Sequence, residues 1–372
     1  MASEVDQLAA KASFPPSKVY MLATDSQGRA ILSVHIKRTY QISPNGQCVR
    51  TDDLPLLLGN PEAEDDDDFN ETDILPFKQR IDLIVMAKAW GKGQRQITAG
   101  IRTPNHQVSY RVSGDRRVSY HGKGTWTFGQ PEPFDSIEMR YENAYGGFDP
   151  STALPPVVHI QDILAPDPGV YPRNPVGKGY AVVEGSQLDG LLLPNIENPE
   201  DTLTPQRLVS GTPSNWWRQP LPWSCNWFPK FWYPRLSQFG AIPSGLPQDD
   251  RQVPEVRLGY LDAGHVQRIQ NSTLESEVDA RFGDAASPAL ILPPTTPIAA
   301  IELTGLSPEG RMVVRIPPDR PRVYLRHLGR SVELPTTPHR VLVSMLEMGV
   351  YVVWHAAWPL PDGFFDSKSR RA

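Results

Sequence analysis

Segments in which apolar and polar residues partly alternate lie near both ends of the chain. Alternation places every second side chain on one face of a strand, and these segments are also rich in Val, Ile and Tyr. We predict antiparallel strands at residues 18–23, 30–42, 80–90, 107–112 and 118–121, and again at 299–303, 311–316, 322–328, 341–346 and 350–358. The last two segments flank Glu347, Met348 and Gly349 and therefore predict a hairpin.

Helical patterns are scarce. The best helix candidate, residues 272–281, is short and weakly amphipathic. The 39 prolines outnumber the 28 glycines and are spread along the whole chain, which forbids long helices. No segment repeats another at a fixed period, which argues against a solenoid or a propeller.

The middle of the chain has a different character. Prolines recur every few residues between 149 and 254, and we predict long ordered loops with short strands there. The many aromatic residues argue against disorder. The predicted fold is mainly β, with an antiparallel, sandwich-like body built from both chain ends. Its parts are a β-rich segment at 14–148, a loop region at 149–290, a second β segment at 291–360 and a tail at 361–372.

Charge and cysteine content narrow the function classes. The formal charge of −5 comes from scattered residues, so we predict no nucleic-acid surface. The acidic run at 62–68 lacks the spacing of a calcium loop and is interpreted as solvated. Cys48 and Cys225 lie far apart and favour reduced thiols. No signal peptide and no membrane span is recognised, so we expect a cytoplasmic protein.

Four polar islands mix turn-forming residues (Asn, Pro, Gly) with one or two charged residues. They lie at 140–147, 174–179, 193–199 and 232–235, and their composition is typical of rigid, side-chain-bonded loops. We expect the turn at Gly146 and Gly147 to need positive φ or a close backbone approach. The predicted structural residues are Arg140, Glu142, Tyr145, Gly146, Gly147, Asn174, Pro175, Gly177, Gly179, Asn195 and Glu197.

Enzymatic templates fit poorly, and we predict no catalytic residue, metal or cofactor. The Gly177-Lys178 pair lacks the glycine and the hydroxyl residue of a phosphate loop, so we expect a tight turn with Lys178 facing water. The eight histidines show no metal-ligand spacing. Glu142 and Glu197 could form an acid/base pair in a carbohydrate-active enzyme. Their alternative role is to accept backbone N–H bonds or to pair with an arginine such as Arg140 or Arg235.

Five of the nine tryptophans lie between positions 216 and 232. Buried Trp and Tyr need a hydrogen-bond partner for their polar end, so they favour interfaces that are partly apolar and partly hydrated. The same residues could instead cap the core of a sandwich. Both roles stay open. The predicted partner-binding residues are Trp216, Trp217, Trp223, Trp227, Phe228, Phe231, Trp232, Tyr233 and Arg235. A glycan-binding module that stacks sugars on the tryptophans is the alternative.

The order of these islands resembles domain-of-unknown-function family 2169. Lys78 and Asp82, the segment 114–116, the four islands and the later segments 279–282 and 301–306 carry the likeness, which spans roughly residues 18–358. The resemblance implies a non-enzymatic adaptor or chaperone of Gram-negative type VI secretion. Such a protein binds an effector, commonly one with a PAAR domain, and helps to load it on the VgrG spike. The chain departs from the family pattern at Trp217 and in the aromatic segment 225–228, where a partner-specific surface is expected.

Overall fold

The fold is mainly β. The structure, a computed structural model, describes residues 17–24, 30–59, 71–76, 78–152, 169–230, 232–235, 280–327 and 330–360. Within these ranges there is no helix of seven or more residues, which agrees with the limit that the prolines set. The helical segments are short 3-10 helices: η1 (Tyr141–Asn143), η2 (Ser186–Leu188), η3 (Pro205–Arg207), η4 (Pro213–Arg218), η6 (Ala280–Gly283) and η7 (Pro288–Leu290).

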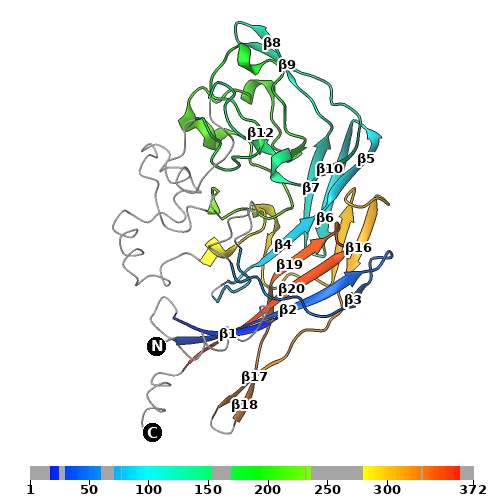
Figure 1. Cartoon of the computed structure of the whole chain (residues 1–372), viewed down its shortest axis with the longest axis vertical. Coiled ribbons are helices and arrows are strands. Elements are labelled where there is room, and N and C mark those ends of the chain that lie inside the picture. The colour runs from blue at the N-terminus through cyan, green and yellow to red at the C-terminus, as the bar shows by residue number, and fades with distance from the viewer. Residues whose placement is uncertain are drawn as a thin grey trace.

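The first sheet joins both ends of the chain, as predicted. Its strands follow the order β1-β2-β20-β19-β4-β14, and β3 pairs with β2. The long strands β2 and β20 pair antiparallel from Ile31 to Gln41, and Figure 1 shows these blue and red strands side by side. The strand bounds are β1 (Lys18–Thr24), β2 (Ala30–Ile42), β3 (Cys48–Arg50), β4 (Ile81–Met86), β14 (Ile291–Leu292), β19 (Thr337–Ser344) and β20 (Gly349–Pro359).

One pairing in this sheet departs from the antiparallel prediction, because β4 runs parallel to β19. Every residue of β4 from Ile81 to Val85 is buried, so the strand carries no alternation that could reveal its surroundings. The segment 80–90 was predicted as one strand. The structure divides it into β4 and β5 (Lys88–Gln94), with Ala87 between them.

A second sheet packs against the first. Its order is β13-β7-β6-β15-β16, and its pairings are antiparallel. Ile84 and Val352 of the first sheet share one core cluster with Ile101 and Val314 of the second, which confirms the sandwich-like body. The strand bounds are β6 (Gln96–Thr103), β7 (His106–Ser113), β13 (Ile196–Glu197), β15 (Ala300–Thr304) and β16 (Arg311–Arg315).

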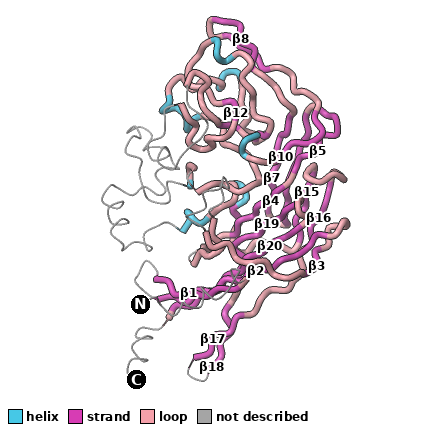
Figure 2. The backbone as a smooth tube through the Cα atoms, in the orientation of Figure 1, coloured by secondary structure: helices cyan, strands magenta, loops and turns pink. Residues whose placement is uncertain are grey.

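Loops dominate residues 141–152, 169–230 and 232–235, as Figure 2 shows in pink. A separate cluster of buried residues, here called the tyrosine-rich core, includes Tyr145, Tyr171, Tyr180, Trp216 and Tyr233. Two-stranded sheets complete the fold: β5 with β10 (Phe134–Glu138), β8 (Val118–Gly122) with β9 (Thr125–Phe128), β11 (Tyr145–Gly146) with β12 (Lys178–Gly179), and β17 (Val323–His327) with β18 (Arg330–Leu334).

Some predicted features lie outside the described residues. These are the acidic run at 62–68, Phe231, the tail at 361–372 and most of the helix at 272–281. Cys48 and Cys225 are described, and both are buried free thiols. Burial raises the pKa of Cys48 to about 11 and that of Cys225 to about 12, so both thiols are protonated at neutral pH.

A network of buried charges fastens β4 and β19 to the adjacent loops. Arg340 on β19 donates to Asp73 at 2.8 Å and lies 3.6 Å from Asp82. Lys37 also donates to Asp73, at 3.0 Å, and Lys78 donates to Asp82 at 3.0 Å and to Asp284. All of these side chains are buried, so each charge depends on its partners.

Three buried histidines lie beside this network: His35 on β2, His339 on β19 and His355 on β20. Their ring centroids are 5.0 to 5.8 Å apart, and Ser33 Oγ lies within hydrogen-bond distance of His35 and His355. Burial lowers the pKa of His35 to about 3 and that of His355 to about 4, and it lowers the pKa of His339 well below 6.5. The three rings are therefore neutral at pH 7.

We expect the urea midpoint of unfolding to fall as pH drops from 7 to 5. Unfolded histidine takes up a proton near pH 6.5, whereas these buried rings do so only at lower pH, so the unfolded state binds more protons below pH 6.5. Stability from the neutral rings is complete above pH 6.5 and is lost as pH falls toward the folded pKa values. Each histidine contributes about 1.4 kcal/mol per pH unit in that window.

A variant of one ring separates this effect from carboxylate titration. Neither ring nitrogen of His339 has a hydrogen-bond partner among the described residues, so leucine can replace it without orphaning a polar group. We expect His339→Leu to reduce the pH slope by one proton. Equal slopes for His339→Leu and the unsubstituted protein would contradict this account.

Candidate partner-binding site

Two of the polar islands form one joint. Tyr145 and Gly146 of β11 pair in parallel with Lys178 and Gly179 of β12. The buried side chain of Asn174 donates to the carbonyl oxygens of Tyr141 and Tyr145 at 2.8 and 3.0 Å. Pro175 is buried in the following turn, and a Cβ atom on Gly177 would meet the Cα atom of Gly146 at 2.8 Å. The first island is thus fixed to the second by backbone and side-chain bonds.

The backbone requirement predicted for Gly146 and Gly147 is confirmed. Their φ angles are 152° and 90°. A Cβ atom on Gly146 would overlap the carbonyl oxygen of Asn174, and one on Gly147 would lie 2.5 Å from the carbonyl oxygen of Gly177. Only glycine satisfies both the angles and the close approach.

Asn195 connects the third island to this joint. Its backbone N–H donates to Asn143 at 2.9 Å, and its side chain donates to Ser113 and Asp115 at 3.0 and 2.9 Å. Lys178 donates to the Asn195 side-chain oxygen at 2.7 Å. Lys178 is half-buried, which lowers its pKa, so the prediction that this lysine faces water is wrong. Its ammonium group links the second island to the third through this hydrogen bond.

Glu197 has the structural role that was the alternative to acid/base chemistry. The carboxylate is buried, and it accepts hydrogen bonds from Arg111, Arg116 and the backbone N–H of Leu203. Two guanidinium groups and an amide occupy the oxygens that a general acid or base would need. Glu142 is exposed and lies 3.4 Å from Arg140, the partner predicted for it.

Arg235 was predicted as a partner-binding residue and as a partner for an island glutamate, but the structure places it inside the protein. It forms two ion-pair bonds with Glu71, at 2.5 and 2.9 Å. It also donates to the carbonyl oxygens of Phe228 and Phe282 at 2.7 Å. Arg235 is therefore a buried structural residue that holds the segment around the aromatic run in place. The spacing of residues along the chain gave no sign that Glu71 is its partner.

The aromatic run supplies several packing clusters instead of one exposed surface. Trp216 and Tyr233 belong to the tyrosine-rich core, and Trp227 belongs to the main core, where Arg340 lies over its ring at 4.8 Å. Phe228 and Trp232 pack edge-to-face with each other and with Tyr141. These five side chains are buried, so their exposure does not support the prediction that they contact a partner directly.

Trp217, Trp223 and Leu221 lie nearer to the surface. The Trp217 side chain is 38% exposed and Leu221 is 36% exposed. Trp223 is half-buried and donates its indole N–H to the carbonyl oxygen of Ser109 at 2.8 Å. Trp217 packs under the guanidinium of Arg218 at 4.9 Å. This part of the run combines apolar area with contact to water, as interface anchors do.

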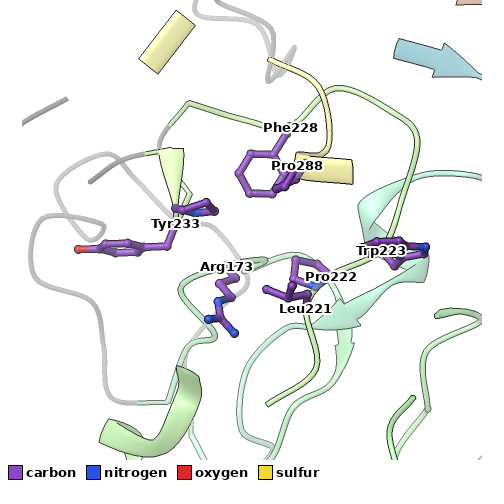
Figure 3. A pocket seen from close by; sticks show the side chains of 8 residues that line it. Arg173, Leu221, Pro222, Trp223, Phe228, Tyr233 and Pro288 are labelled. Carbon is purple, nitrogen blue, oxygen red and sulfur yellow. The ribbon is translucent and has the colours of Figure 1, made fainter. Parts of the chain in front are cut away.

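A small apolar hollow opens beside these residues. Figure 3 shows Leu221, Pro222 and Trp223 along one side, with Phe228 and Pro288 opposite and Arg173 and Tyr233 completing the wall. Its cavity volume is about 20 Å³. This is room for about one water molecule, so the hollow is a shallow depression that a partner could only cover, and the exposed Leu221 lies at its edge.

The wall of the hollow is held rigidly. Arg173 is buried, donates to the carbonyl oxygens of Trp217 and Gln219 at 3.2 and 3.3 Å, and lies over the Trp216 ring at 5.0 Å. Tyr171 donates its hydroxyl to the carbonyl oxygen of Pro220 at 2.8 Å. These bonds fix the backbone between Trp217 and Leu221, so little order must be gained on binding. Neither Arg173 nor Tyr171 was predicted as a site residue, because isolated residues between prolines carry no periodic signal.

No group of three or more His, Cys, Asp or Glu side chains with metal-binding geometry occurs in the described ranges. In those ranges no helix is long and apolar enough to cross a bilayer.

A family model described as "Uncharacterized protein conserved in bacteria (DUF2169)" matches residues 27–355. No curated protein and no solved structure gives a significant match.

Proposed function

The chain belongs to this bacterial DUF2169 family, and from that premise we propose that it is a non-enzymatic adaptor that binds a type VI secretion effector. The adaptor stabilises its cargo in the producing cell and assists its loading on the PAAR/VgrG spike. The observation that carries the proposal is the partly exposed apolar surface of Leu221 and Trp217, which is built on rigidly bonded loops beside the shallow hollow. A preformed apolar surface suits the binding of a protein partner without the consumption of energy.

The carbohydrate-active alternative has less support. It needs two carboxylates free to act on a substrate, and Glu197 is bonded to Arg111 and Arg116 inside the protein. No observation favours a sugar-stacking platform over a protein contact at Trp217. We therefore propose the adaptor role alone.

We expect the tagged chain to co-purify with the spike-associated effector encoded beside it, to remain bound during size exclusion and to raise the soluble yield of that effector. Apolar area buried in the hollow supplies the affinity, at roughly 25 cal/mol per Å² before association costs. Leu221→Asp places a charge at the mouth of the hollow and should weaken binding at least about tenfold, measured by titration calorimetry.

Leu54→Asp is the matched control, because Leu54 is also exposed but lies away from the hollow. It should bind the effector like the unsubstituted protein. Trp227 and Trp232 are unsuitable for this test, since alanine at either buried position would open a cavity. Absence of a complex with any spike-associated neighbour would refute the adaptor proposal.

A further inference from the structure

A second and larger apolar hollow lies where three hairpin turns meet β5. The turns are those between β2 and β3, between β15 and β16, and between β19 and β20, which contribute Pro44, Leu306 and Met345 respectively. β5 contributes Lys88 and Trp90. The cavity volume is about 440 Å³. We call this hollow the methionine groove, after its residues Met312, Met345 and Met348.

Most of the side chains that line the groove are apolar, and Lys88 and Glu309 are the charged ones. Leu306 and Met312 are buried below, and Met345 and Met348 are half-buried at the wall. Leu346 stands at the rim with 53% of its surface exposed. Methionine side chains are flexible and polarizable, and they adapt to apolar partners of varied shape. An exposed leucine beside an apolar hollow marks a surface that gains free energy when it is covered.

Backbone hydrogen bonds hold the frame of the groove. The N–H of Met345 donates to Met86 at 2.8 Å, and the carbonyl oxygen of Met348 accepts from Ile42 at 2.7 Å. The carbonyl oxygen of Gly305 accepts from Trp90 at 2.9 Å. The groove therefore combines a fixed backbone with adaptable side chains, which limits the ordering cost of binding.

The rim carries unbalanced negative charge. Lys88 lies 3.3 Å from Glu138, which offsets its charge. Glu309 lines the groove, is exposed, and has no ion-pair partner among the residues that the structure describes. Glu347, in the turn beside Leu346, accepts a hydrogen bond from Tyr351 at 2.6 Å. A partner that brings a cation to this rim gains electrostatic complementarity.

We propose that the methionine groove binds an apolar protein segment that carries Lys or Arg beside its apolar side chains. The apolar side chains cover Leu346 and the methionines, and the cation meets Glu309. A protein segment fits better than a small metabolite, because the groove lacks the set of converging polar groups that orients a small ligand. Assignment of the segment to the effector rests on the proposed function, but the binding chemistry does not.

Labelled peptides test the proposal by fluorescence anisotropy on the full chain. One peptide places Leu and Phe on one helical face and Lys at its flanks, a second replaces Lys by Glu, and a third scrambles the first. We expect the first peptide to bind tightest. Leu346→Glu should weaken it at least about tenfold, since a charge would be buried under the peptide. Glu309→Lys should shift the preference toward the Glu-flanked peptide.

Leu22→Glu is the matched control, because Leu22 has the same exposure of 53% but lies on β1. It should leave peptide binding unchanged. The proposal is overturned if the first peptide binds no better than the scrambled one, or if Leu346→Glu binds like the unsubstituted protein. Self-association that Leu346→Glu abolishes would instead assign the groove to a second copy. Peptide binding without effector co-purification would reject the adaptor role and leave the groove chemistry standing.

Discussion

Replacement of Arg340 by Met should lower the free energy of unfolding by about 3–5 kcal/mol, because it leaves two buried carboxylates without their shared cation. Arg340 pairs with Asp73 at 2.8 Å and lies near Asp82 at 3.6 Å. Burial opposes its charge, but Asp73, Asp82 and Glu71 together outweigh that effect and raise its pKa. Its guanidinium also packs over the Trp227 ring. Chemical denaturation monitored by tryptophan fluorescence would measure the loss.

The matched control is Arg102→Met, which removes an exposed arginine that pairs with Glu302. We expect a much smaller change, since exposed ion pairs contribute little. Arg340→Lys should lie between the two, because it restores the charge without the planar guanidinium. A denaturation midpoint for Arg340→Met equal to that of the unsubstituted protein would show that Lys37 and Lys78 suffice to neutralise the carboxylates.

Several of the strands that were predicted have one face more buried than the other. Burial alternates along β7, β15 and β16, and the predicted hairpin forms between β19 and β20. β6 was missed although it pairs with β7 and although Ile97, Ala99 and Ile101 occupy every second position; its Ala, Gly and polar residues make it poor in the Val and Tyr that marked the other strands. β4 and β19 were both predicted as strands, but their parallel pairing was not, since continuous burial carries no sign of strand direction.

The candidate site was predictable in composition but not in exposure. Aromatic density drew attention to positions 216–235, yet Trp216 and Trp232 are buried while Trp217 is partly exposed. Neighbours in sequence can enter different clusters when turns between them reverse the chain, and local composition cannot show those turns. The methionine groove had no sequence signal at all, because its residues come from four distant segments.

The polar islands affect the proposed function indirectly, through the stability of the loops. They fix the loops that carry the apolar hollow, so a defect at their joint should loosen the hollow without touching it. Gly146 accepts a hydrogen bond from Tyr180 at 3.0 Å, and Gly147 donates to Asn174 at 2.8 Å and accepts from Tyr171 at 2.9 Å. Tyr171 and Tyr180 both belong to the tyrosine-rich core. The position of the segment between Arg173 and Leu221 therefore depends on the geometry of the joint.

Gly146→Ala should destabilise the protein by about 3 kcal/mol, because the new Cβ atom would overlap the carbonyl oxygen of Asn174 in a backbone that cannot move away. Thermal melting would measure the change, and the soluble variant should also lose effector affinity. Gly190→Ala is the control, with positive φ of 78° and no atom within 4 Å of the new Cβ. It suffers backbone strain alone, about 1 kcal/mol. If both variants melt alike, strain and not the close approach to Asn174 limits this position, and the joint is looser than its hydrogen bonds indicate.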